Sequence, residues 1–285
     1  MPAALTIRTV NVAQAPQETG GPLNRLLRSA HAWQFVIFLG AAPSIFIAIA
    51  ASTSADEKLP TARWVLNRYA EVSGERANLL KHKSVTIHGR YQVPADKLEA
   101  ATVSYTKGGA SVQTFQLADG RRGATGYDGH VGWEVGLSGK VTIHAGDEAR
   151  TMARDADMYY HLHVMQYFKS LDVVGVQNFG GRPCYHLKGT NNWDQPNEQF
   201  YDKENGLLLG YKFNTAWRGG NGAADAIFED YKPFAGILFS TKQIGHDSNT
   251  MDVSFTDSVT WDDVPDSALQ LPSAVKAKLA AESPK

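Results

Sequence analysis

The sequence predicts a mainly β domain of the α+β class, in which one antiparallel sheet curls into an incomplete β-barrel and short helices cover its opening. Three features predict this fold: hydropathy that alternates with a period of two, turn signals at short intervals, and few helices for the amount of apolar strand surface. The chain has 285 residues, of which 43% are hydrophobic and 20% charged. This composition is typical of a folded globular protein.

Charge and cysteine content exclude several classes of protein. The formal net charge is -1, and acidic and basic residues are mixed along the chain without a basic stripe. Nucleic acid is therefore excluded as a partner. The single cysteine, Cys184, rules out an internal disulfide framework and a multi-cysteine zinc site.

The first 55 residues differ from the rest of the chain. Arg25 and Arg28 precede an apolar run over 33–51, and small residues follow it. This order predicts a secretory signal peptide that is cleaved at the end of the segment. The run is also close to the roughly 18 residues that span a bilayer, so retention as an N-terminal membrane anchor is the alternative. In either case we expect one exported domain over 56–285, because no linker divides it.

A helix opens this domain and strands follow. Thr61 is a suitable N-cap for a helix that runs to about Ser73, with Gly74 as its stop. The helix carries one apolar stripe, formed by Val65, Leu66, Tyr69 and Val72. From residue 83 the periodicity changes to two, which predicts strands with one apolar and one polar face. The expected apolar faces of the first strands are Val85, Ile87, Gly89, Tyr91 and Val93, then Ala101, Val103 and Tyr105, then Phe115 and Leu117.

A hairpin is predicted around "GYDGHVGWEV". Asp128–Gly129 is typical of a two-residue turn, which would place Trp133 opposite Ala124 and leave room for the indole. Tyr127 would lie with His130 on the other face, near the rim. The residues expected on the apolar face are Val131, Trp133 and Val135.

The alternation continues to the end of the chain, with two interruptions. Acidic residues after Gly146 predict a short helix, and prolines at 265 and 272 introduce a terminal helical segment. Further strands are expected at 141–145, 173–176, 185–187, 207–217, 226–231, 236–244 and 251–261. The last of these should place Met251, Val253, Phe255, Val259 and Trp261 on one face.

About ten strands with an apolar face are thus accompanied by one clear helix and two short ones. A sheet of this size without helical cover must curl on itself. So many aromatic residues favour a wide apolar interior that receives an insoluble ligand without a cofactor or a metal. The residues expected to line this cavity wall are Tyr91, Tyr105, Phe115, Val131, Trp133, Val135, Tyr211, Phe213 and Phe255.

Five motifs in this order resemble one known family. They are "LPTARWVLNRYAEVSG", "GYDGHVGWE", "FYDKENGLLLGYK", "FEDYKPFAGILFSTKQI" and "DDVPDSALQLP". Together they resemble the LolA-like outer-membrane lipoprotein-sorting proteins of the LolA/LolB superfamily, over about residues 59–280. The resemblance implies a non-enzymatic periplasmic carrier that binds acyl chains of a lipid or lipoprotein and exchanges them with a membrane-bound donor or acceptor. The alternative is a membrane-anchored envelope sensor or interaction module with the same pocket, which retention of residues 33–51 at the inner membrane would favour.

Two pairs of residues suggest rival functions. His161 and His163 have a spacing that suits zinc on a strand, but no third ligand is visible nearby, so we assign them structural roles. Cys184 and His186 could form a thiol–imidazole dyad. Their side chains would point in parallel from one strand, whereas a nucleophile usually meets its base from another element, so we interpret them as a lone thiol and a solvated imidazole.

Carboxylates and one serine offer weaker signals for calcium or catalysis. Asp257, Asp262, Asp263 and Asp266 do not fit an EF-hand and lie in a proline-containing turn, where aspartates bond to local backbone. Ser138 lacks the nucleophile-elbow pattern and is interpreted as a hairpin residue. Glu229 and Asp230 are adjacent and would point to opposite faces of a strand, which does not suit acid–base catalysis on one bond.

Overall fold

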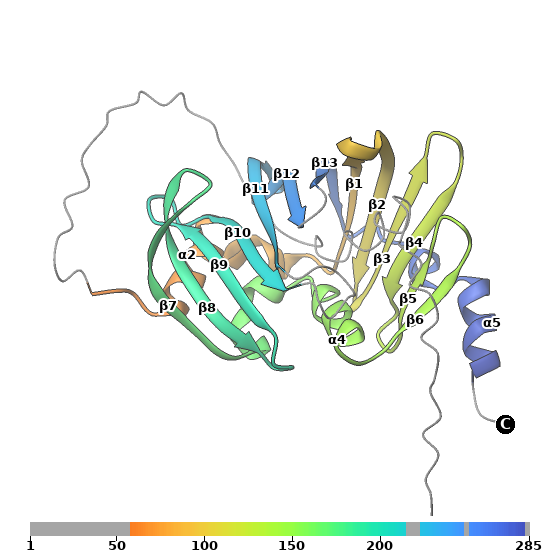
Figure 1. Cartoon of the computed structure of the whole chain (residues 1–285), viewed down its shortest axis with the longest axis horizontal. Coiled ribbons are helices and arrows are strands. Elements are labelled where there is room, and N and C mark those ends of the chain that lie inside the picture. Colours follow the sequence, from red (N-terminus) through yellow and green to blue (C-terminus); the bar gives the residue numbers. More distant parts are fainter. Residues whose placement is uncertain (1–57, 215–222, 248–250, 283–285) are drawn as a thin grey trace, which may run out of the picture.

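The computed structural model describes residues 58–214, 223–247 and 251–282, which form one antiparallel sheet and its covering helices. The sheet has 13 strands within these ranges, in the order β6-β5-β4-β3-β2-β1-β13-β12-β11-β10-β9-β8-β7. Its edge strands, β6 and β7, do not pair with each other, so the curled sheet stays open (Figure 1). The predicted fold class, an incomplete barrel, is confirmed. The apolar run at 33–51 lies outside the described ranges, and no helix within them is long and apolar enough to cross a membrane.

The strands are β1 Ser84–Val93, β2 Leu98–Lys107, β3 Ala110–Leu117, β4 Arg122–Tyr127, β5 Gly132–Val135, β6 Val141–His144, β7 Phe168–Phe179, β8 Arg182–Asn191, β9 Pro196–Asp202, β10 Leu208–Asn214, β11 Ala223–Phe234, β12 Ile237–Asp247 and β13 Met251–Trp261. The α-helices are α2 Ala62–Val72, α3 Glu75–Asn78, α4 Gly146–Asp155 and α5 Ser273–Glu282. Short 3-10 turns are η1 Leu79–Lys81, η2 Pro94–Asp96, η3 Tyr160–Leu162, η4 Val164–Tyr167 and η6 Asp266–Leu269.

Helix α2 forms as the sequence predicts. The Thr61 hydroxyl accepts a hydrogen bond from the backbone N–H of Trp64 at 3.2 Å, which caps the helix. Gly74 follows the helix with φ 74°, and a Cβ there would lie 2.2 Å from the carbonyl oxygen of Gly236. Glycine is therefore required at this position both for its backbone angle and for the close approach of the β11–β12 turn.

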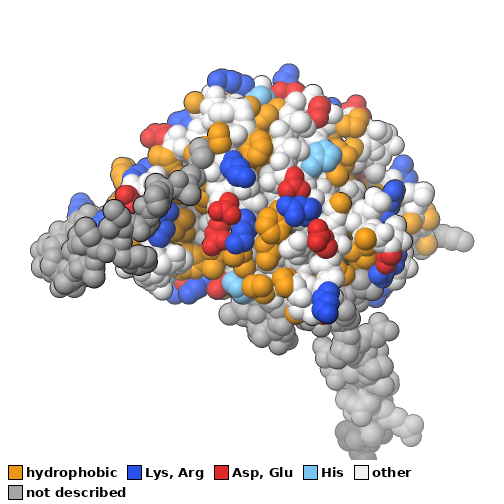
Figure 2. All heavy atoms as spheres, turned by 90° about the horizontal axis from the view of Figure 1, so that it is seen from above, with side chains coloured by type: hydrophobic (Ala, Val, Ile, Leu, Met, Phe, Trp, Pro, Cys, Tyr) orange, Lys and Arg blue, Asp and Glu red, His pale blue; other side chains and the backbone are white. Residues whose placement is uncertain are grey.

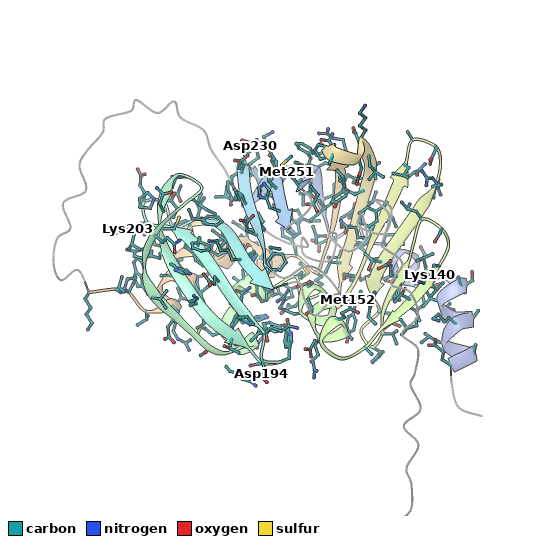
Figure 3. All side chains as sticks on the ribbon, viewed as in Figure 1. Lys140, Met152, Asp194, Lys203, Asp230 and Met251 are labelled. Atoms are coloured by element: carbon teal, nitrogen blue, oxygen red, sulfur yellow. The ribbon has the colours of Figure 1, made fainter. Side chains whose placement is uncertain are left out.

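The two faces of the sheet are covered by different elements. Side chains of α2, η4 and β7–β11 form one buried cluster on the face that we call the inner face. Helix α4 lies between the two halves of the sheet (Figures 1 and 3), and the Met152 sulfur would be 2.7 Å from a Cβ at Gly132 on β5. The segment from α4 to η4 therefore crosses the inner face between the two sheet edges.

The C-terminal helix covers the opposite, outer face. The predicted terminal helical segment is α5, and its Val275 packs against Trp133 on β5 and Val112 on β3. Trp133 is 1% exposed, so this contact buries the whole indole. A helix on the outer face was not expected from the sequence, which predicts cover only for the barrel opening.

The register of the β4–β5 hairpin corrects one prediction. Trp133 lies opposite Gly126 and not opposite Ala124, because the turn contains four residues instead of two. The Asp128 carboxylate accepts hydrogen bonds from the backbone N–H groups of His130 and Val131, at 2.9 and 2.7 Å, which closes this longer turn. The need for a small partner is confirmed, since a Cβ at Gly126 would be 2.8 Å from the indole.

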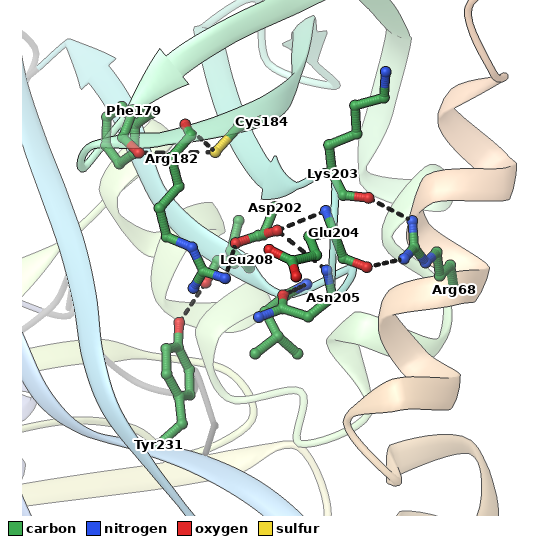
Figure 4. Close-up of polar contacts among 11 residues, drawn as sticks. Arg68, Phe179, Arg182, Cys184, Asp202, Lys203, Glu204, Asn205, Leu208 and Tyr231 are labelled. Carbon is green, nitrogen blue, oxygen red and sulfur yellow. Dashed lines mark hydrogen bonds and ion pairs between the residues drawn. The ribbon is translucent and has the colours of Figure 1, made fainter. Parts of the chain in front are cut away.

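The β9–β10 turn is fixed to α2 (Figure 4). The Arg68 guanidinium donates hydrogen bonds to the carbonyl oxygens of Lys203 at 3.0 Å and Glu204 at 2.6 Å. Asp202, at the end of β9, is 0% exposed and pairs with Arg182 at 2.6 Å while it accepts the backbone N–H of Glu204. These contacts hold the N-terminal helix against the inner face of β9 and β10.

Trp133→Ala should lower the free energy of unfolding by about 3–5 kcal/mol, because it empties a buried site between α5 and the sheet. Chemical denaturation measures this loss. Trp64→Ala is the matched control, since Trp64 is 46% exposed, and its cost should stay below about 1 kcal/mol. Equal losses for the two variants would contradict the packing of α5 on Trp133.

Candidate functional site

The nine predicted wall residues divide between the two faces of the sheet. Tyr91, Phe115, Tyr211 and Phe213 lie on the inner face, where Tyr91 and Phe115 contact each other with ring centroids 6.2 Å apart. Tyr105, Trp133, Val135 and Phe255 lie on the outer face, as their strand pairing shows. Val131 is in the turn before β5. The idea that one wall contains all nine residues is therefore wrong.

A β-bulge explains the position of Phe255. Ile87 on β1 pairs with Val259, but after the bulge Arg90 pairs with Phe255. The extra residue in β13, Asp257, shifts the alternation, so Val259 faces inward and Phe255 outward. The Arg90 guanidinium accordingly lies 4.7 Å from the centre of the Phe255 ring on the outer face.

Apolar side chains on the inner face keep partial contact with solvent in the half formed by β7–β11. Tyr211 and Phe213 of β10 are half-buried, as are Tyr160 and Leu162 of η3, and all four pack against the cluster beneath α2. The Tyr211 ring meets Phe228 edge-on at 5.4 Å. This partly exposed apolar surface is the best candidate contact for an acyl chain. Tyr160 and Leu162 were not among the predicted residues, because only the fold brings η3 over β10.

Buried polar groups lie beneath the same cover. The Tyr69 hydroxyl donates to Glu75 Oε1 at 3.3 Å, and His161 Nδ1 lies 3.1 Å from the same oxygen. Glu75 is 1% exposed and His161 is 6% exposed. Burial, together with the charge of Glu75, raises the pKa of Tyr69 well above its ordinary value. The hydroxyl therefore remains a donor, and this group fastens η3 to the start of α3.

An arginine also reaches this region from α4. The Arg154 guanidinium donates to Asp155 Oδ1 at 2.8 and 2.6 Å and lies 5.7 Å from the centre of the Tyr160 ring. Burial raises the pKa of Tyr160 to about 12, although the charge of Arg154 opposes the shift. The Arg154–Asp155 pair therefore holds η3 beside α4.

His161 and His163 do not form a metal site. His161 lies on η3 and His163 lies between η3 and η4, so neither is on a strand, and each is held by a different carboxylate. His161 contacts Glu75, whereas His163 Nε2 makes a very short contact with Asp157, which also accepts the Tyr167 hydroxyl at 2.7 Å. Within the ranges that the structure describes, no group of three metal-ligating side chains is found.

Cys184 and His186 share the outer face of β8 without forming a dyad. The Cys184 thiol donates to the carbonyl oxygens of Phe179 and Arg182, at 3.8 and 3.4 Å. His186 binds Glu198 at 2.7 Å and stacks on Phe200 with centroids 4.6 Å apart. Cys184 is 0% exposed, and burial raises the pKa of its thiol to about 12. A thiol in this state is a poor nucleophile.

The four aspartates near the C-terminus connect strands instead of gathering around a cation. Asp257 pairs with Arg90 at 3.0 Å, and Asp266 pairs with Lys107 at 2.7 Å. Asp262 accepts the backbone N–H of Lys83 at 2.6 Å and contacts His82, while Asp263 accepts the Thr86 hydroxyl at 2.8 Å. All four therefore attach β13 and the chain after it to β1 and β2.

The two remaining candidates are also structural. Ser138 is exposed in the β5–β6 turn. Glu229 pairs with Lys242 at 2.7 Å on the neighbouring strand, and Asp230 has φ 55° at an irregular point of β11. On the surface seen in Figure 2, acidic and basic side chains alternate with apolar ones. This mixture agrees with the absence of a basic stripe in the sequence.

The chain has the LolA-like fold. A LolA superfamily protein from Nitrosomonas europaea has a similar structure, with a TM-score of 0.52 and 16% identity over 75% of this chain and 99% of its own. A DUF1329 family protein from Desulfovibrio piger matches with a TM-score of 0.50 and 14% identity over 73% of this chain and 98% of its own. No family model and no curated protein sequence matches the chain. At these identities the similarity establishes the fold alone.

Native protein should resist thiol reagents at about pH 8, because Cys184 is buried and largely protonated there. Absorbance with a disulfide reagent should show no reaction in buffer and one thiol per chain in denaturant. The raised pKa also makes stability depend on pH: the contribution is complete below the unfolded value of about 8.5 and is lost as the pH rises toward about 12. Rapid labelling of the native protein would contradict this burial.

Proposed function

We propose that this protein is a periplasmic, non-enzymatic carrier that binds acyl chains of a lipid or lipoprotein on the inner face of its open barrel. The observation that carries the proposal is the half-buried apolar surface of Tyr211, Phe213, Tyr160 and Leu162, which lies inside an unclosed sheet. The LolA-like fold supports it. Histidine, cysteine and carboxylate side chains that could suggest chemistry are occupied in structural contacts.

Hydrocarbon burial would supply the affinity. Each methylene removed from water contributes about 0.8 kcal/mol, so an acyl chain with ten buried methylenes gains roughly 8 kcal/mol before the cost of ordering it. Little directional bonding is needed for this gain. Release then requires a membrane or partner protein that offers the chain an equally apolar place, which a membrane-bound donor or acceptor provides.

The export part of the proposal depends on the segment before the domain. A mobile carrier requires cleavage near Ala55, whereas retention of 33–51 would tether the domain to the inner membrane and favour the sensor alternative. Edman sequencing of protein recovered from the periplasmic fraction separates these cases. We expect a mature N-terminus near Asp56.

Native mass spectrometry of protein purified from its own envelope tests the carrier function directly. We expect bound species whose masses correspond to acylated lipids or lipoproteins, and uptake of a fluorescent fatty acyl probe after they are removed. Lipid-free protein that also fails to take up the probe would contradict the proposal.

Phe213→Ser should weaken binding of the acyl probe about fivefold to twentyfold, because it replaces apolar contact surface with a hydroxyl on the inner face. Fluorescence titration measures the change. Phe255→Ser is the matched control: it changes the same residue type, also half-buried in a neighbouring part of the sheet, but on the outer face. Its affinity should stay within twofold of the original protein, and a similar loss in both variants would exclude the inner face as the site.

A further inference from the structure

The inner face is not uniformly apolar. A set of polar side chains, here called the polar band, crosses it from β4 through β3, β2, β1 and β13 to β12. Register places its members on the same face as Tyr91 and Phe115. The polar band consists of Thr102, Ser104, Gln113, Thr125, Gln243, Ser254 and Thr256.

The polar band separates two apolar clusters. On one side lies the cluster of Tyr91, Val93, Phe115 and Leu117, and on the other lies the cluster around Phe239 with Ile87 and Val259 packed against it. Neighbouring strands are about 4.8 Å apart, so five strand spacings from β4 to β12 extend over roughly 24 Å of sheet surface. A purely apolar ligand would offer no hydrogen-bond partner to any polar group along this width.

The side-chain carbonyl oxygens of two glutamines in the polar band lack hydrogen-bond partners within the described residues. Gln243 is 7% exposed, and its Oε1 forms no hydrogen bond within the described part of the chain. Gln113 Oε1 on β3 is likewise buried without a partner. An unsatisfied buried carbonyl costs on the order of 1–3 kcal/mol, so a ligand that donates a hydrogen bond to it removes this cost. Ser104, Ser254 and Thr256 are only half-buried, so a ligand can reach the band at these three residues.

The charges near the band disfavour an anion. Glu134 and Asp252 lie on the same inner face, on β5 and β13. The Lys and Arg residues of the strands that form the band occupy register positions of the outer face: Arg90, Lys107, Arg122 and Lys242. A phosphate group on the band would therefore meet acceptors and carboxylates, and none of the Lys and Arg residues of the band's own strands shares its face.

We propose that the cargo carries an uncharged, hydroxyl-rich glycosyl headgroup, which lies along the polar band while its acyl chains contact Tyr211 and Phe213. This inference rests on the proposed carrier function and specifies its cargo. Sugar hydroxyls both donate and accept hydrogen bonds, so they can satisfy the two glutamine carbonyls and the serine and threonine hydroxyls together. The width of the band suits a headgroup of more than one sugar ring.

Competition between lipids with identical palmitoyl chains tests the inference. Purified protein is loaded with a fluorescent fatty acyl probe and titrated with the dipalmitoyl forms of diglucosyl diacylglycerol, phosphatidylglycerol or a lipopeptide, so that all three carry two identical chains. We expect the glycolipid to displace the probe with a Kd at least tenfold lower than that of phosphatidylglycerol. Equal displacement by phosphatidylglycerol, or tighter binding of the lipopeptide, would overturn the inference and leave the carrier function standing.

A double variant, Gln113→Leu with Gln243→Leu, tests the band itself. It should weaken glycolipid binding about tenfold and keep the affinity for the acyl probe within twofold. Gln116→Leu is the control, because Gln116 is exposed on the outer face of the same strand as Gln113, and it should change neither affinity. Unchanged glycolipid binding in the double variant would overturn the inference. If the double variant does not fold, the comparison of lipids on the original protein decides alone.

Uptake of the acyl probe distinguishes failure of the carrier function from failure of this inference. Protein that takes up no acyl probe at all would remove the proposed function, and this inference with it. Probe uptake without a preference among the three lipids removes only the inference.

Discussion

The structure depends on the alternation of side chains across a single sheet. Every strand presents residues to two faces, and apolar side chains on either face of a sheet that does not close on itself need cover. Helix α2 and the segment from α4 to η4 cover the inner face, whereas α5 covers the outer face at Trp133. The short edge strand β6 therefore has helices on both sides, and the barrel can remain open there without exposing a large apolar surface.

Capping residues and hydropathy patterns predicted the helices and strands well, because hydrogen bonds and contacts between residues close in sequence form these elements. Thr61 caps α2 through its own hydroxyl, and the acidic residues after Gly146 begin α4. The β4–β5 turn was misjudged because Asp128 bonds to the backbone of His130 and Val131, and this four-residue arrangement competes with the two-residue turn that Asp–Gly favours. Both turns fit the sequence, and only the paired strands decide between them.

The face of a strand was harder to predict than its existence. On β2, Ala101, Val103 and Tyr105 point outward, and Thr102 and Ser104 point inward. Hydropathy assigns the more apolar set to the interior, but here the partner strands fix the register through Tyr91 and Phe115. The bulge at Asp257 then reverses the first part of β13, so Phe255 joins Tyr105, Trp133 and Val135 on the outer face.

The mixed inner face separates two tasks that a uniform apolar cavity would combine. The free energy gained from hydrocarbon burial grows with the number of buried methylenes and depends very little on the headgroup that the chain carries. Buried carbonyls such as those of Gln113 and Gln243 act in the opposite way. A ligand group that donates a hydrogen bond to them adds only about 1 kcal/mol to the free energy of binding. A ligand group that leaves them unpaired, or that brings a negative charge, lowers the affinity by more than this. In the proposed carrier, the apolar contacts would therefore set how tightly cargo binds, and the polar band would set which cargo is rejected.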